Sequence, residues 1–293
     1  MPDQLKVTLL DQPVPSCSGN PIHLKPLTTL CQDCRVSGLC LPTGLPIHDN
    51  SCLGALIGPR MRVRKGAALF NANDPLTTLY AVHCGSFKTS LNTAEGQGVV
   101  INFWMPGDVL GLDAIATERH VCDAIALEDS EVCPVPYRRL QALAHDFPVL
   151  QQSLNRLMSK EIVRQHERVL MLCNLTAEER LASFLLGLSR RFVSRGYSAH
   201  GFMLRMSRED MASYLGLRLE TVCRSVARLR TLGIVSLRGR LVEILDMPAL
   251  VALEQGYGDS ARTGGKRHLG PLCGPSPRFV ATTSQLPQEL RKA

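Results

Sequence analysis

The sequence predicts an α+β protein in which a β jelly roll is followed by a long helix and a winged helix-turn-helix domain. Three observations support this class. Short β-prone runs separated by Gly, Pro, Asn and Asp fill residues 47–145, as is typical of a small barrel or jelly roll. A helical period of apolar residues replaces them after Pro148. Two short helical patterns and a hairpin pattern then follow one another between residues 207 and 244.

The 293 residues can bury more than one hydrophobic core, so we expect two folded domains with flexible ends. The predicted parts are a flexible arm (1–30), a cysteine-containing loop (31–46), the jelly roll (47–145), the long helix (146–174), the winged helix-turn-helix domain (175–250) and a disordered basic tail (251–293).

Composition and charge restrict the setting in which the chain works. No stretch approaches the roughly 18 apolar residues of a membrane span, and the opening MPDQLKVTLLDQ is not of the secretory type. We therefore expect a cytoplasmic protein that does not contact a membrane. The net charge of +7 suggests an anionic partner. The Gly-, Pro- and Ser-rich segment from residue 256 onward, however, contains six Lys or Arg and only two Asp or Glu. Part of the positive charge therefore belongs to the tail.

The stretch CQDCRVSGLC places Cys31, Cys34 and Cys40 at a C-x2-C-x5-C spacing. Eleven cysteines dispersed over a chain of this length do not form a secreted disulfide scaffold. In a reducing compartment, a tight group of thiols binds a metal or performs redox chemistry. Thiolates suit tetrahedral zinc and iron-sulfur clusters alike, so both remain open on the spacing alone.

The long helix carries an apolar seam at steps of four or three residues, with one polar position in it. Such a seam fits a coiled-coil dimer interface, and packing against the helix's own domain is the alternative. We favour the dimer because the rest of the helix is polar. The seam consists of Leu154, Met158, Ile162, Gln165, Val169 and Leu172.

The segment 207–233 has the layout of a helix-turn-helix. Ser207 and Asp210 can cap its first helix, and Gly216 permits the tight turn. On the second helix, the side opposite the apolar face carries a possible base-reading set: Glu220, Cys223 and Arg224. In the major groove, an Arg can take both acceptors of guanine while a carboxylate accepts from cytosine. An ordinary surface ion pair is the alternative for Glu220 and Arg224.

The hairpin pattern GIVSLRGRLVEI completes a winged helix, which favours double-stranded DNA as the partner. Four arginines on the second helix and the wing would contact backbone phosphates: Arg228, Arg230, Arg238 and Arg240.

Together these motifs make the chain resemble the Crp/Fnr transcription regulators, and above all the oxygen-sensing members of that family. The similarity runs from about residue 28 to 250 through CQDC at 31, KGAALF at 65, PGDVLGLDAIA at 106, EERLASFLLGLSRRF at 178 and YLGLRLETVCR at 214. The resemblance implies a cyclic-nucleotide-binding-like jelly roll as sensor. It also implies an activator that binds TTGAT-like palindromic DNA as a homodimer under low oxygen, touches RNA polymerase, and controls genes of anaerobic or microaerobic metabolism.

The resemblance implies a [4Fe-4S] cluster as the cofactor. Cys31, Cys34 and Cys40 match the first three ligands, and Leu39 could shield the site. The fourth ligand of the family follows an acidic stretch and precedes a Pro, as in EDSEVCPVP, so we assign Cys133 and leave Cys122 as an extra thiol. The alternative is a winged-helix regulator whose thiols hold structural zinc or act as a redox site.

Two positions depart from the family's oxygen sensors. Gln165 stands where they carry an Asp whose charge opposes dimerisation, so we expect a dimer that depends less on oxygen. Cys223 stands where they carry a Ser in the reading helix. A thiol is a poorer hydrogen-bonding group than a hydroxyl, so we expect altered preference at the neighbouring base pair.

Three other functions are less compatible with the sequence. A cyclic nucleotide is not expected as a ligand, because Asp113 and Asp123 flank the region where the family's nucleotide-binding members use a Glu and an Arg, although Arg119 is nearby. A cupin-type enzyme would need a His-rich metal site, and the barrel segment has no H-x-H pair. An electron carrier would not need a winged helix. We therefore do not expect an enzyme.

Overall fold

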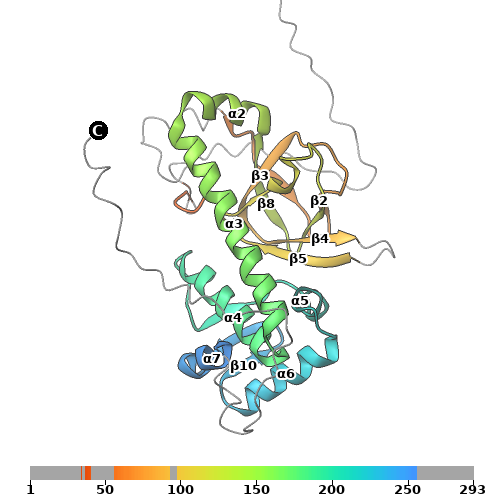
Figure 1. The fold of residues 1–293 in the computed structure, drawn as a ribbon, viewed down its shortest axis with the longest axis vertical. Helices are drawn as coiled ribbons and strands as arrows, with labels where there is room; N and C mark the ends of the chain where they lie inside the picture. The colour runs from red at the N-terminus through yellow and green to blue at the C-terminus, as the bar shows by residue number, and fades with distance from the viewer. Residues whose placement is uncertain (1–33, 35–36, 41–55, 93–97, 256–293) are drawn as a thin grey trace, which may run out of the picture.

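The computed structural model describes residues 34, 37–40, 56–92 and 98–255 (Figure 1). The first domain is a jelly roll of two four-stranded antiparallel sheets, as the sequence predicts. One sheet has the order β1 (Met61–Val63), β8 (Ser130–Pro136), β3 (Thr78–Cys84) and β6 (Val109–Leu110). The other has the order β2 (Ala68–Phe70), β7 (Asp123–Ala126), β4 (Phe87–Asn92) and β5 (Gly98–Trp104). A short 3-10 turn, η2 (Leu112–Ala114), follows β6.

Two helices lead out of the barrel. The first, α2 (Tyr137–Asp146), directly follows β8, and α3 (Pro148–Asn174) begins two residues after it ends. Pro148 suits the first turn of α3 because a proline there lacks only an N–H that no helix carbonyl would accept. At 27 residues, α3 is roughly 40 Å long at 1.5 Å per residue. It runs from the barrel to the C-terminal domain (Figure 1).

The C-terminal domain is a winged helix, which confirms the predicted fold class. It contains α4 (Ala177–Val193), β9 (Gly201–Met203), α5 (Arg208–Leu215), α6 (Leu219–Thr231), β10 (Val235–Arg238), β11 (Leu241–Ile244) and α7 (Met247–Glu254). Capping boxes start α4 at Thr176 and α5 at Ser207. Helix α7 ends at Glu254, a little beyond the predicted limit of residue 250. The rest of the predicted tail, like the predicted arm, lies outside the described residues.

One of the hydrophobic clusters is shared by the two domains. Val100, Phe103 and Met105 of the barrel are buried in the same cluster as the apolar residues of α4, α5 and α6. The ring of Phe103 contacts those of Phe184 and Tyr214, with centroids 6.0 and 5.2 Å away. Within the described segments, no helix is long and apolar enough to cross a membrane.

Candidate cysteine site and nucleic-acid interface

Cys133 lies on β8, between β1 and β3, and its backbone pairs with that of Ala81. Its side chain is half-buried against the apolar cluster beneath α2 and the start of α3. Burial raises the pKa of the Cys133 thiol, the positive charge of Arg60 acts to lower it, and a negative charge on Cys34 acts to raise it. Cys133 therefore sits in a fixed, partly dry position with a cation and a second thiol nearby.

Cys34 and Cys40 approach Cys133 from the segment that precedes the barrel. The Cys34 sulfur lies 3.6 Å from Nδ1 of His83 on β3. Cys40 packs against the same apolar cluster as Cys133. Cys31 lies outside the described residues. Three of the four predicted cysteine ligands thus lie at the same part of the barrel.

Cys122, the alternative fourth ligand, lies in a different environment. It is buried in the core between the two sheets, and its thiol donates to the Asp113 carboxylate at 3.4 Å. Burial and the negative charge of Asp113 raise the pKa of this thiol far above its usual value. A thiol so held is a poor thiolate donor, which agrees with the choice of Cys133.

Leu39 is half-buried and lines a small cavity of about 220 Å³ together with Leu112 and Leu157. Among the described residues, no three His, Cys, Asp or Glu side chains are grouped closely enough to hold a metal ion. The thiols that lie near one another are nevertheless chemically suited to an iron-sulfur cluster or to zinc, both of which take sulfur donors.

The predicted seam of α3 divides into two parts in the structure. Leu154 is 5% exposed and packs inside its own subunit, as does Met158, while Leu172 packs against the C-terminal domain. Ile162 and Val169 are 55% and 57% exposed. The half-buried Gln165 donates to Glu161 on the same helix. Only the middle of the predicted seam is therefore open to a partner.

Exposed apolar residues outside the predicted seam widen the open part of α3. Val163 and Leu170 are 51% and 58% exposed. Val163 directly follows the seam residue Ile162, and Leu170 directly follows the seam residue Val169. The sequence pattern could have identified them, because they repeat Ile162 and Val169 one position later with the same spacing of seven.

Helix α6 separates its buried and exposed faces as predicted. Val222 and Leu229 are buried, and Ser225 is also buried although sequence reasoning did not assign it to the core. The predicted base-reading residues are all exposed: Glu220, Cys223 and Arg224. The guanidinium of Arg224 lies 3.4 Å from the Thr221 hydroxyl and has no carboxylate partner among the described residues.

The wing projects beside α6. Gly239 adopts φ +61° at the turn between β10 and β11, a backbone conformation that favours glycine. The flanking Arg238 and Arg240 are exposed, as is Arg230 at the end of α6. Arg228 is also exposed but lies 3.9 Å from Glu178 on α4, so its charge is partly neutralised within the domain. Among these arginines, those on the wing are the better placed for phosphates.

Sequence reasoning missed a charged joint between the barrel and α4. Asp108, in the turn between β5 and β6, forms ion pairs with Arg191 at 2.6 Å and with Arg195 at 3.0 Å. Arg164 of α3 lies 3.7 Å from the same carboxylate. Burial alone would raise the pKa of Asp108, but the three arginines bring it below its usual value. These contacts join residues far apart in the sequence, so no local pattern reveals them.

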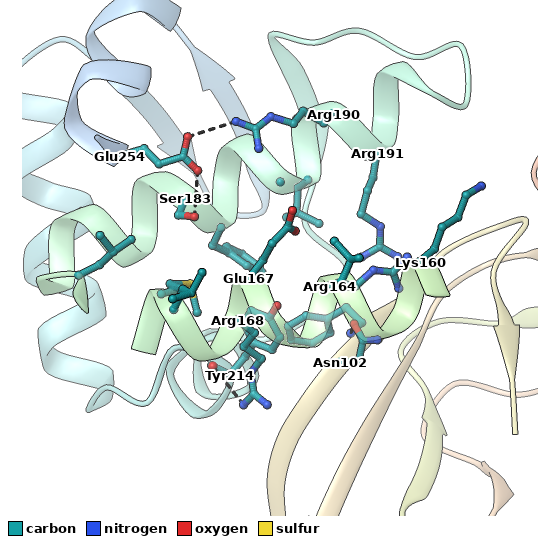
Figure 2. A pocket seen from close by; sticks show the side chains of 18 of the residues that line it. Asn102, Lys160, Arg164, Glu167, Arg168, Ser183, Arg190, Arg191, Tyr214 and Glu254 are labelled. Atoms are coloured by element: carbon teal, nitrogen blue, oxygen red, sulfur yellow. Dashed lines mark hydrogen bonds and ion pairs between the residues drawn. The ribbon is translucent and has the colours of Figure 1, made fainter. Parts of the chain in front are cut away.

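Next to this joint, a cavity of about 830 Å³ lies between α3 and α4 (Figure 2). Figure 2 shows Lys160, Arg164 and Arg191 gathered at one end. At another wall, Glu254 accepts from Arg190 and Ser183. Arg164 and Arg191 are neutralised by Glu161 and by the Asp108 of the joint. The cavity therefore marks where the two domains and α3 meet, and three of its cations, Arg164, Arg190 and Arg191, are already paired with carboxylates.

Comparison with known proteins agrees with this architecture. Residues 60–147 match the cyclic nucleotide-binding domain and residues 179–253 the Crp-like helix-turn-helix domain. The transcriptional regulatory protein btr of Bordetella pertussis is 40% identical over 79% of this chain and 96% of its own length. The fumarate and nitrate reduction regulatory protein of Salmonella typhimurium is 40% identical over 76% of this chain and 89% of its own. The chain belongs to the Crp/Fnr family of transcription regulators.

A solved structure gives the same result for the fold. FixK2 from Bradyrhizobium japonicum matches with a TM-score of 0.63 and 30% identity, covering 68% of this chain and 97% of that one. The match to the cyclic nucleotide-binding domain concerns the fold of the barrel.

The two acidic residues at the positions compared with the Glu and Arg of nucleotide-binding members make internal hydrogen bonds. The Asp113 carboxylate accepts from the Val121 backbone N–H at 2.9 Å and from Cys122. Asp123 accepts from the Ala72 backbone and from Asn92. An anionic phosphate brought here would meet two carboxylates.

Proposed function

We propose that this Crp/Fnr chain is an oxygen-responsive transcriptional activator of anaerobic and microaerobic metabolism genes. It acts in the cytoplasm, as a homodimer on palindromic TTGAT-like sites of double-stranded DNA, in contact with RNA polymerase, and is not an enzyme. The observation that carries the proposal is that Cys34 lies near Cys133 of the barrel and that Cys40 packs on the same apolar cluster as Cys133, while the barrel shares a hydrophobic cluster with a winged helix. Relatives named anaerobic regulatory protein support it.

Cys31, Cys34, Cys40 and Cys133 would hold a [4Fe-4S] cluster, whose iron supplies a reactive target for oxygen. Cys133 is fixed by the two strands that flank β8, whereas Cys34 and Cys40 belong to the segment before the barrel. A shared ligand set would tie that segment to β8, and its loss would release the segment. Leu39, next to Cys40, would limit access of water and oxygen to the site.

The segment that carries Leu39 and Cys40 can influence α3, because this segment and α3 line the same cavity. Leu39 lines the small cavity with Leu157 and Glu161 of α3 and with Arg191 of α4. Dimerisation would bury the open part of α3, where Ile162 and Val169 are more than half exposed. Burying such apolar surface stabilises by about 25 cal/mol per Å². The state of the cysteine site would thus bias dimerisation and the placement of the winged helices.

In the DNA complex, α6 would lie in the major groove. Arg224 would take the two acceptors of a guanine and Glu220 would accept from the paired cytosine. Arg238 and Arg240 of the wing would contact phosphates, and Arg228 and Arg230 would assist from the end of α6. Two half-sites about one helical turn apart would match a two-fold symmetric dimer.

The test is to purify the chain without oxygen and to assay iron, acid-labile sulfide and zinc. DNA binding to a TTGAT palindrome is then followed as air is admitted. About four iron and four sulfide per chain, as four cysteine ligands require, with loss of DNA binding in air, is the expected result. An iron-free protein whose DNA binding is indifferent to air would contradict the proposal.

Structural zinc, or a thiol redox site, is the second candidate, because the donor set alone suits it. Stoichiometric zinc in that assay would select it. A cyclic nucleotide is not proposed as a ligand, since Asp113 and Asp123 occupy the relevant part of the barrel through their own hydrogen bonds.

A further inference from the structure

The strand β3 is irregular beside the cysteine site. Val82 pairs with Val132 of β8, but the next pair joins Cys84 to Glu131, so the register shifts across His83. An extra residue of this kind bends the strand and redirects its side chain. His83 is half-buried, and its Nδ1 lies 3.6 Å from the Cys34 sulfur. The bulge therefore brings an imidazole to one of the predicted ligands.

A second hydrogen-bonding group reaches the other side of the site. Met61 of β1 pairs with Val132, so Arg60 comes alongside Cys133 at the start of the strand. Its guanidinium lies close enough for its charge to act on the Cys133 thiol. The Gly58 N–H donates to the Pro134 carbonyl at 3.1 Å and fixes the backbone just before Arg60.

The carboxylate nearest to these groups is already engaged. Glu131 on β8 accepts from Arg62 at 2.8 Å. Glu131 nevertheless still acts on the Cys133 thiol by its charge, in the direction opposite to Arg60. Cys34 therefore has an imidazole on β3 within hydrogen-bonding distance, and Cys133 has a guanidinium beside it from the residue just before β1.

We propose that His83 and Arg60 are positioning residues that hydrogen-bond the cysteine sulfurs of Cys34 and Cys133 and stabilise the cluster these cysteines hold. This inference rests on the proposed function, because it needs the cluster. Hydrogen bonds to cysteine sulfur withdraw electron density and set the reduction potential of iron-sulfur sites. Such outer ligands orient the direct ones and affect the metal's affinity.

The test uses the full chain purified without oxygen, with iron and sulfide assayed on the unaltered protein first. The variants are His83→Ala and Arg60→Ala, with His83→Gln and Arg60→Lys as variants that keep a donor. His145→Ala and Arg64→Ala are controls, since both positions are exposed and neither forms a hydrogen bond or ion pair with a cysteine among the described residues. Circular dichroism reports folding, and optical redox titration and the decay of cluster absorbance in air are the readouts.

Both alanine variants are expected to shift the midpoint potential to more negative values. They should also lose cluster absorbance in air about tenfold faster, the lower end of what outer-ligand substitutions cost metal sites. The Gln and Lys variants should recover part of each effect, and the controls should match the unaltered protein. Alanine variants that fold but hold no iron, beside Gln and Lys variants that do, would also support the inference.

Alanine variants with an unchanged potential and an unchanged decay rate would overturn the inference while leaving the proposed function intact. Equal loss of iron from the alanine and the donor-keeping variants would overturn it too. An unaltered protein without iron and sulfide would instead refute the proposed function, so the two failures are distinguishable.

Discussion

Cys122 is buried in the barrel and Cys133 is half-buried there, yet their surroundings predict opposite roles. Cys122 lies between the sheets with its thiol on Asp113, whereas Cys133 lies beside Cys34 and Arg60. A nearby carboxylate disfavours a thiolate, and a nearby guanidinium favours it. The difference separates a core thiol from a candidate ligand.

We therefore expect Cys133→Ser to abolish iron and sulfide binding and Cys122→Ser to preserve both. A serine at position 122 can still donate to Asp113, so that variant serves as the matched control. Iron and sulfide assays after anaerobic purification check this. Retention of a full cluster by Cys133→Ser would contradict the assignment of the fourth ligand.

Cys223 is exposed in the middle of the predicted reading face of α6. A thiol is a weak hydrogen-bond donor and acceptor, so Cys223→Ser should sharpen preference at the base pair next to the one read by Glu220 and Arg224. One added base contact corresponds to about 1 kcal/mol or slightly more, roughly a tenfold change in preference at that position. A binding selection on randomised half-sites is the measurement, and an unchanged site preference would remove any role for this residue in specificity.

At the scale of the elements, α3 shows what periodicity can and cannot reveal. The seam pattern correctly indicates a long helix with an apolar face, and it does not tell which part of that face the subunit uses itself. Leu154 serves the barrel and Leu172 the C-terminal domain, because the helix spans both. What remains for a partner is the stretch around Ile162, Gln165 and Val169.

Gln165→Asp should weaken the dimer. The new carboxylate would face its copy across the seam and would also stand four residues from Glu161, its present hydrogen-bond partner. Sedimentation at low micromolar concentration should show a dimer dissociation constant raised at least about tenfold, or 1.4 kcal/mol. Gln152→Asp, at an exposed position of the same helix, is the control. Equal dimerisation of both variants would show that position 165 is outside the interface.

The short elements of the C-terminal domain were the most predictable. The helix cap at Ser207, the turn at Gly216 and the hairpin around Gly239 are local signals, and each lies where the sequence predicts. Ser225 was missed because a small polar residue can be buried where neighbouring helices approach closely, which periodicity of apolar residues does not report.

At the scale of the whole molecule, the fold class followed from local patterns, but the union of the two domains did not. The shared core depends on Phe103, Phe184 and Tyr214, which come from three separate elements. Lys88 of β4 pairs with Asp210, the capping residue of α5, so even a local helix cap is used between domains. Such contacts join residues that are far apart in the sequence, so no short stretch of the sequence reveals them.

The joint at Asp108 gives this union a pH dependence. Since the pKa of folded Asp108 lies below its usual value, its ion pairs stabilise the fold at every pH above that usual value. The stabilisation is lost as the pH falls through the lowered pKa. Near neutral pH, the carboxylate is therefore charged and holds Arg191 and Arg195, the latter with a side chain only 5% exposed.

Asp108→Asn should leave these two guanidinium groups without a counter-charge in a partly dry site. Removing one partner of a buried ion pair costs about 3–5 kcal/mol, so a large drop in the free energy of unfolding is expected near pH 7. The same change at Asp146, which is exposed, should have little effect. Urea unfolding at pH 7 and at about pH 3 measures both, the lower pH lying just under the ordinary Asp value.

The difference in free energy of unfolding between the unaltered protein and Asp108→Asn should be smaller at the lower pH. Protonation of Asp108 removes the same charge that the substitution removes. Calorimetry adds a second readout. If Asp108 joins the domains, its loss should split one unfolding transition into two, since the barrel has two hydrophobic clusters of its own and most of the shared cluster belongs to the winged helix. A single transition at nearly the original temperature would mean that the shared aromatic core, and not the arginine cluster at Asp108, holds the two domains together.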